Sequence, residues 1–417
     1  MQRLFCAFRV WFQKKAYLRI ILIAIDNGSC YQDFTRRDGR NLGNRPDDDW
    51  SELVAVSLNV EVNERTPTEL ETAVAELKAA EPNLRARDIA SKLDVSEAEL
   101  VAMRVGDGVT RLDTKWTELV KALPLVGEVM VLTRNEHCVH EKTGTFNKVR
   151  VSDRGGIVLD PEIDLRIFFS HWAHAFHVTE SLESGVRQSI QIFDHDGTAV
   201  HKIYARPETN MESFDALVGV RRAVGQGVGV EVTRHLGTAP DPKISSSEEP
   251  TEAEVAELKR RWSQIKDTHD FFPMLADLKL ERVEALTMVE GTYTKSVTPS
   301  SFKRALELAA ADGLAIMIFV PNPGVIQIHT GPVKNIKEMG PWINVLDPRF
   351  NLLLKMDSIA KAWIVRKPSV DGDVTSLEIF DADNQQIAFM FGARKPGDPE
   401  LTAWRALLAA LEGECEL

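Results

Sequence analysis

The pattern of apolar and polar positions predicts two runs of strands, with helices before, between and after them. Between residues 128 and 204 short apolar runs alternate with polar breaks, and the same alternation returns between residues 316 and 391. Such alternation is typical of half-buried strands, and breaks that contain Gly, Pro or Asp predict turns. Runs of like elements indicate an α+β fold with mainly antiparallel sheets rather than alternating β-α-β units.

Helices are predicted from capping signals as well as from periodicity. Thr66-Pro67-Thr68-Glu69 places a capping residue before a proline and predicts a helix that runs to Leu77. Ser96 is expected to cap the second of two short helices within residues 87–103. Further helices are expected at about 210–222, 251–266, 301–311 and 399–412.

The two strand-rich regions are copies of one another. Residues 133–201 align without a gap to residues 320–388, and seventeen of these 69 positions are identical. We therefore predict a tandem repeat of two similar halves, each with a large, mainly antiparallel β-sheet flanked by helices. The expected organisation is a poorly structured extension over 1–65, a first repeat over 66–237, a linker over 238–254 and a second repeat over 255–417.

Chemically capable residues stand where the two copies differ. His201 aligns with Ala388, Arg134 with Pro321, His140 with Gln327, and Lys142 with His329. Because structure alone is a poor explanation for such differences, they predict an asymmetric site on a symmetric scaffold. On a strand, His201 is suited to bind a transition metal through Nε2, and Arg134 to hold an anion. The structural alternatives are a half-buried histidine bonded to a backbone carbonyl and an exposed arginine with no task.

Composition narrows the function classes. A chain of 417 residues with 44% apolar and 27% charged residues is typical of soluble globular protein with two or three domains. The net charge of −12 argues against a nucleic-acid partner, and four scattered cysteines fit a reducing cytosol. The apolar run over 16–25 is about half the length that a membrane helix needs, so no membrane span is expected. An artefact of start-site choice and a targeting segment are the alternatives for this N-terminal region.

Three further motifs have structural explanations. His171, His174 and His177 would suit zinc on a helix, but the aligned second copy predicts a strand, on which His174 points away from the other two. Asp-His-Asp-Gly at 194–197 is predicted to be a hairpin turn, because a calcium loop needs further acidic ligands. Residues 85–100 resemble a helix-turn-helix, but acids stand where base contacts would be needed, so a structural helical hairpin is expected.

Several longer segments carry a family resemblance. They are Leu-Thr-Arg-Asn at 132–135, Val-His-Glu at 139–141, Phe-Asp-His-Asp-Gly at 193–197 with His-Lys-Ile-Tyr at 201–204, Thr-His-Asp-Phe-Phe at 268–272, and Ala-Trp at 362–363 through Arg-Lys-Pro at 366–368 with Thr-Ser-Leu-Glu at 375–378. Over about residues 66–417 the chain resembles the bacterial haemin-degrading and haem-trafficking proteins of the HemS/ChuS type. The resemblance implies a cytoplasmic protein of two similar halves with stacked antiparallel sheets, which binds one haem (iron protoporphyrin IX).

The resemblance also implies a set of haem-contacting residues. It maps the axial iron ligand onto His201, and it maps the arginine on the opposite haem face, the expected catalytic residue, onto Arg134. Gln327 and His329, from the other half, match positions that line the haem pocket. The chain departs from the family at Pro-Asn-Pro-Gly-Val, 321–325, where Gly-Asn-Arg-Gly-Cys is usual, so no role is carried over to that loop.

Two functions follow from this reading. The first is oxidative degradation of imported haem to release iron, with Arg134 orienting water or peroxide. The second is a carrier that stores haem or delivers it to a separate haem oxygenase. The expected partners are haem, the cytoplasmic side of a haem ABC importer and such an oxygenase; the electron donor is not identified. A DNA-binding regulator that uses residues 85–100 is a third class, and the net charge counts against it.

Overall fold

The computed structural model describes residues 23–26, 29–32, 65–233, 250–395 and 397–414. Near the N-terminus, β1 (Ile23–Asp26) and β2 (Ser29–Gln32) pair antiparallel. They belong to a unit separate from the one formed by residues 65–417, which carries everything described below. The rest of the predicted extension, and residues 238–249 of the predicted linker, lie outside the described residues.

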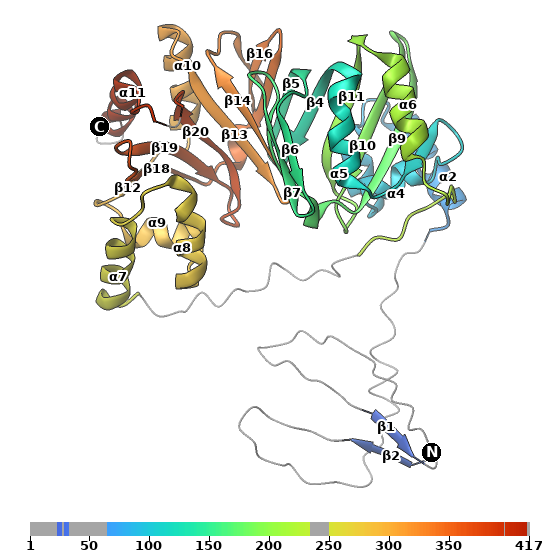
Figure 1. Ribbon diagram of the computed structural model, residues 1–417, viewed down its shortest axis with the longest axis horizontal. Helices are drawn as coiled ribbons and strands as arrows, with labels where there is room; N and C mark the ends of the chain where they lie inside the picture. Colours follow the sequence, from blue (N-terminus) through green and yellow to red (C-terminus); the bar gives the residue numbers. More distant parts are fainter. Residues whose placement is uncertain (1–22, 27–28, 33–64, 234–249, 396, 415–417) are drawn as a thin grey trace. The chain divides into compact units, whose positions relative to one another are not determined.

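The larger unit is built on two nine-stranded sheets, visible in Figure 1. In spatial order the first sheet contains β15 (Ile336–Met339), β16 (Trp342–Asp347), β17 (Phe350–Lys355), β5 (Cys138–Thr145), β4 (Gly127–Arg134), β11 (Ala199–Thr209), β10 (Gly185–Phe193), β9 (His174–Leu182) and β3 (Val109–Leu112). The second sheet contains β12 (Thr294–Val297), β18 (Lys361–Lys367), β19 (Val374–Phe380), β20 (Gln386–Gly392), β13 (Ile316–Asn322), β14 (Val325–Gly331), β8 (Asp164–Phe168), β7 (Gly155–Leu159) and β6 (Val149–Ser152). The predicted α+β class and the repeat of two similar halves are confirmed.

Each sheet takes three strands from the other repeat. Strands β15 to β17 come from the second repeat and join the first sheet where β17 pairs with β5. Strands β6 to β8 come from the first repeat and join the second sheet where β8 pairs with β14. The alternation of apolar residues predicts hairpins, but it carries no information on where a three-stranded meander docks. Each repeat therefore completes the sheet of the other.

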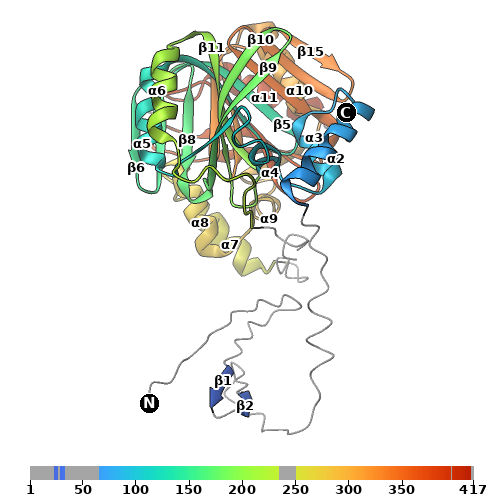
Figure 2. The ribbon, with the colours of Figure 1, turned by 90° about the vertical axis from the view of Figure 1, so that its right-hand side faces the viewer.

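Helices cover both faces of the sheets. The inner faces of the two sheets face each other, and two apolar cores lie between them. Each core combines residues of both sheets. One core also contains residues of α5 (Trp116–Ala122) and α6 (Met211–Arg221), and the other contains residues of α10 (Ser301–Asp312) and α11 (Thr402–Glu414). On the outer face of the first sheet lies α4 (Glu97–Ala102), with α2 (Pro67–Ala80) and α3 (Ala86–Leu93) packed on it; Figure 2 shows α2 to α4 apart from α5 and α6. On the outer face of the second sheet lie α7 (Glu252–Trp262), α8 (Phe271–Leu278) and α9 (Arg282–Met288).

The local signals in the sequence are confirmed. Thr66 caps α2 in a reciprocal capping box with Glu69, and Ser96 does the same for α4 with Glu99. The turn at 194–197 joins β10 to β11 as predicted. His174 and His177 lie on β9, three positions apart and so on opposite faces of the strand. Among the described residues, no three His, Cys, Asp or Glu side chains converge on a common metal position.

Within the described ranges, none of the helices combines the length and the apolar composition needed to cross a membrane.

Candidate functional site

A buried polar seam joins the inner faces of the two sheets. Gln327, on β14, donates through Nε2 to the carbonyl oxygens of Val131 (3.2 Å) and His140 (3.0 Å) on the first sheet. Its Oε1 therefore accepts, and it receives the Thr133 hydroxyl at 2.8 Å. Because the Thr133 hydroxyl donates its proton to Gln327, its oxygen accepts a hydrogen bond from Nδ1–H of His201 at 2.9 Å. The seam thus fixes His201 with the proton on Nδ1 and a free lone pair on Nε2.

His201 has the chemistry of an iron ligand but lies in a tightly packed place. The side chain is 1% exposed, its Nε2 has no partner among the described residues, and burial lowers its pKa to about 3, so the ring is neutral. The loop between β13 and β14 of the second sheet packs closely against β11, the strand that carries His201. A Cβ added to Gly324 in this loop would lie only 2.5 Å from Val200 Cγ1. A macrocycle could reach Nε2 only after the two sheets had separated.

Two of the aligned pairs in which the repeats differ, His140 with Gln327 and Lys142 with His329, contact each other across the seam. Gln327 Nε2 lies 2.8 Å from Nδ1 of its aligned partner, His140, and Lys142 Nζ lies 3.4 Å from Nδ1 of its aligned partner, His329. The His329 ring also stacks on Phe350, with centroids 3.8 Å apart. Aligned residues meet in this way only where a pseudo-two-fold axis relates the two repeats.

Two asparagines at aligned positions confirm the axis. Each donates two hydrogen bonds to carbonyl oxygens of the opposite repeat. The four bonds run from Asn135 to Pro321 (3.1 Å) and Ile387 (2.7 Å), and from Asn322 to Arg134 (3.0 Å) and Val200 (2.8 Å). The two acceptor sets are themselves aligned.

The axis corrects the sequence-based argument about repeat-breaking residues. A residue on the axis faces its own counterpart, so two lysines or two identical donors would repel one another or remain unpaired. His140 with Gln327, and Lys142 with His329, are complementary pairs. Structure alone therefore explains these two differences, and Gln327 and His329 serve the contact between the sheets.

Arg134 lies on the opposite side of the first sheet from His201. Successive side chains of a strand alternate, so Thr133 faces the seam and Arg134 faces outward. There Arg134 forms an ion pair with Glu97 of α4, which also accepts from Lys202 Nζ at 3.3 Å. Burial alone would raise the pKa of Glu97, but Lys202 and Arg134 outweigh it and hold that pKa below its usual value. In this structure Arg134 and His201 therefore lie on opposite faces of the first sheet, and their expected places on the two sides of one haem remain a prediction.

The outer face of the second sheet carries a partly exposed aromatic surface. Phe319 on β13 stacks on Phe389 of β20 with centroids 4.7 Å apart, and Phe391 packs edge-on against both, at 5.3 and 5.8 Å. Half-buried Met317 and Ile326 extend the surface along β13 and β14. We call these five residues the aromatic platform. Flat apolar area left partly open to solvent is typical of a ligand site.

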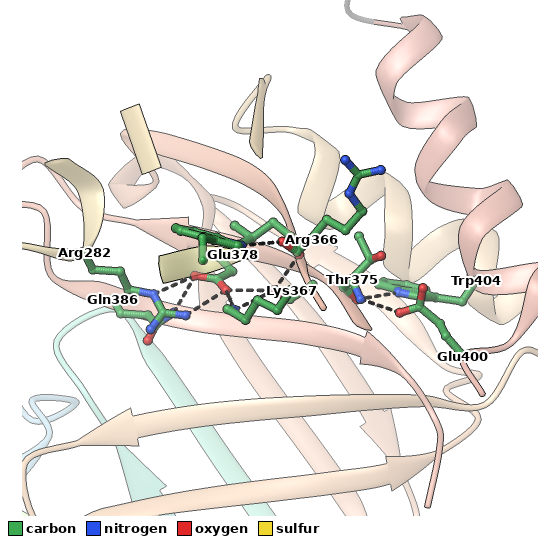
Figure 3. A network of polar contacts seen from close by, with 11 residues as sticks. Arg282, Arg366, Lys367, Thr375, Glu378, Gln386, Glu400 and Trp404 are labelled. Carbon is green, nitrogen blue, oxygen red and sulfur yellow. Dashed lines mark hydrogen bonds and ion pairs between the residues drawn. The ribbon is translucent and has the colours of Figure 1, made fainter. Parts of the chain in front are cut away.

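Charged groups border the platform on both sides. On β8, Arg166 pairs in register with Ile326 and so shares its face; the side chain is 30% exposed and its guanidinium contacts Asp164. On the other side, Glu378 of β19 stands opposite Phe389. Glu378 is fully buried and binds Arg282 and Lys367, which reach it from either side in Figure 3.

A histidine precedes the helix that packs beside Glu378. His269 lies in the short 3-10 helix Thr268–Asp270, and its side chain is 87% exposed. Its Nδ1 lies 2.5 Å from a carboxylate oxygen of Asp267, which fixes the proton there and leaves the Nε2 lone pair free. Phe271, two residues later, packs with Trp363 on the outer face of the second sheet. His269 therefore has the same free lone pair as His201, but in an open position.

Sequence reasoning missed the platform and His269, although two signals pointed to them. The strands that carry Phe319 and Phe389 are apolar at almost every position, whereas a strand with one solvated face alternates apolar and polar residues. A continuously apolar strand therefore indicates that something covers its second face as well. His269 also lies in the Thr-His-Asp-Phe-Phe segment at 268–272, one of those that carry the family resemblance.

Comparisons with known proteins agree with this architecture. A family model described as the haemin-degrading HemS.ChuX domain matches residues 94–220 and 279–411, one in each repeat. The hemin transport protein HemS of Yersinia enterocolitica is 39% identical over 339 residues, which are 81% of this chain and 95% of that protein. Holo-PhuS, a haem-binding protein from Pseudomonas aeruginosa, is 43% identical with a TM-score of 0.78, over 83% of this chain and 99% of that one. ChuS, an E. coli haem oxygenase, is 37% identical with a TM-score of 0.73, over 82% and 99%. The chain therefore belongs to the HemS family.

Proposed function

We propose that this chain binds haem in the cytoplasm and acts in the use of haem after its import. Membership of a family whose relatives are named for hemin transport, haem binding and haem oxygenase activity supports the proposal. The observation that carries it is the aromatic platform, which offers stacked rings to a flat apolar macrocycle.

His269 is the axial iron ligand in this proposal. Its Nε2 is free, its Nδ1–H is held by Asp267, and no strand has to move for haem to approach. A carboxylate behind a ligating imidazole fixes the ring and raises its basicity. Phe272, three residues later and 58% exposed, adds apolar surface on the same side of the helix start. His201, the ligand implied by the resemblance, is the competing assignment, and it needs the seam to open.

Haem degradation is the activity that we propose, with haem carriage as the alternative. Bound iron supplies the oxygen chemistry, and a neutral histidine ligand is compatible with it. Arg166 takes the role that the resemblance assigns to Arg134, because its partly exposed guanidinium lies on the platform face and can donate to water above it. In the alternative, the same surface holds haem for a haem ABC importer on one side and a separate haem oxygenase on the other.

The ligand is tested by titrating haemin into the purified full chain and three variants. We expect His269→Ala to shift the Soret band and weaken binding, and His201→Ala to leave both near wild type. His171→Ala is the matched control, because His171 is 46% exposed and its Nδ1 also contacts an aspartate. A shift with His201→Ala but not with His269→Ala would reverse the assignment. No Soret complex in the wild type would end the haem proposal.

Degradation and carriage are separated by a time course of the haem complex after a reductant is added in the presence of catalase. Loss of the Soret band with release of iron to a chelator is the expected outcome, and Arg166→Ala should slow it at unchanged haem affinity. A complex that persists through the time course would establish the carrier.

A further inference from the structure

Glu378 is the centre of a buried ion cluster beside the platform. Arg282 approaches it with two parallel bonds, from Nε and Nη2, both of 2.7 Å. Lys367 Nζ donates at 2.9 Å, the Ser376 hydroxyl at 2.7 Å and the Gln386 amide at 3.3 Å (Figure 3). A carboxylate with so many donors has one available orientation, and the bidentate geometry passes that orientation on to the guanidinium.

The same two cations enclose the first residue of α8. The Arg282 guanidinium lies 4.9 Å from the Phe271 ring centroid, and Lys367 Nζ lies 4.7 Å from it. Arg282 also lies 4.9 Å from the ring of Phe272, and Phe271 meets Trp262 edge-on at 4.8 Å. Cation–π contacts between desolvated groups are among the stronger ones. The start of α8 is therefore held by charge as well as by apolar packing.

We propose that Arg282 and Glu378 form a clamp that positions His269 for iron. His269 lies two residues before Phe271 in an exposed turn, so the direction of its Nε2 follows from how Phe271 is held. Arg282 and Glu378 are positioning residues here, and neither has to touch haem. The inference rests on His269 being the ligand proposed above.

The test is Arg282→Lys, which keeps the charge but loses the bidentate bond and the planar contact with both rings. We expect haem to dissociate at least about 10-fold faster, with a broadened or shifted ferric Soret band. In the haem-free protein, amide hydrogen exchange at the start of α8 should also become faster, and this readout does not depend on haem. Arg366→Lys is the matched control, because Arg366 is 52% exposed on the same strand as Lys367.

Phe271→Leu is the second variant, because it loosens the helix start without disturbing the buried charges. It should reproduce the faster dissociation and faster exchange. If both variants keep wild-type spectra and dissociation while His269→Ala changes them, the clamp is overturned and the ligand assignment stands. If His269→Ala itself changes nothing, the ligand assignment fails.

Discussion

The outer faces of the two sheets are equivalent by the repeat but differ in chemistry. Where the second sheet presents Phe319, Phe389 and Phe391, the first presents Leu132, Lys202 and Tyr204 at the aligned positions. Lys202 points into the space where an aromatic ring would lie, and Glu97 binds it there. One face is a partly open aromatic surface, and the other is occupied by a buried charge cluster. The scaffold thus permits two sites, and side chains at aligned positions leave one open.

The helix-to-sheet contacts on these faces are reversed in charge. Glu97 is the first residue of α4 and binds two cations on the sheet, Arg134 and Lys202. Arg282 is the first residue of α9 and binds an anion on the sheet, Glu378. In the first half the cations belong to the sheet and cover its face. In the second half one cation comes from the helix, so the centre of the face stays apolar. Both faces therefore have ion pairs between a helix and the sheet. They differ in whether the cation belongs to the sheet or to the helix.

The largest effect is expected from Glu97→Gln. The change leaves Arg134 and Lys202 without a counter-charge, with side chains only 18% and 12% exposed. Removing one partner from such a buried cluster costs about 3 kcal/mol or more of unfolding free energy. Urea unfolding of the haem-free protein measures the loss.

Glu81→Gln is the control for this prediction. Glu81 also pairs with a cation of the first half, Lys92, but the two side chains are 47% and 45% exposed, so a loss under about 1 kcal/mol is expected. Haem affinity of Glu97→Gln should equal that of the wild type, because the platform lies on the other sheet. Equal stability of the two variants would contradict the view that the cluster holds the first face closed.

How far the sequence predicted this molecule depends on the kind of contact. The capping box at Thr66, the turn at 194–197 and the repeat itself are set by neighbours in sequence or by identity, and they were predicted correctly. The exchange of strands between the sheets was not predicted, because pairing of β8 with β14 joins residues about 160 apart with no local signal. The place of Arg134 opposite His201 on haem follows from the resemblance, whereas strand alternation puts Thr133, and not Arg134, on the face of His201.

The second-largest effect is expected from Phe389→Lys. This variant puts on the second sheet the residue type that the first sheet has at the aligned position, Lys202. The variant loses an aromatic ring that stacks on Phe319 and puts a charge on the platform. Loss of an apolar side chain of this size costs about 1.5–3 kcal/mol, which raises the dissociation constant for haem about 10- to 150-fold. Haemin titration measures it. Leu125→Lys, at an exposed apolar residue of the first half, should leave affinity unchanged. Unchanged affinity in Phe389→Lys would remove the platform from the site.

The smallest effect is expected in the pH dependence of stability and concerns His201, the seam histidine whose aligned residue, Ala388, is apolar. Burial lowers the pKa of His201 to about 3 from an ordinary value of 6.5, while the aligned residue is Ala388. Between these values the unfolded chain binds a proton that the folded chain does not, so stability falls as pH falls below about 6.5. Each such proton contributes about 1.4 kcal/mol per pH unit.

His201→Gln keeps a donor for Thr133 but does not titrate. Its unfolding free energy should therefore fall less than that of the wild type between pH 7 and pH 5, by about 1–2 kcal/mol. His140 and His329 remain, and burial lowers the pKa of both, so the variant should still lose stability in acid. Urea unfolding at the two pH values decides the matter. Equal losses in wild type and His201→Gln would mean that the folded protein accepts a proton at His201, and that the seam opens more easily than its packing indicates.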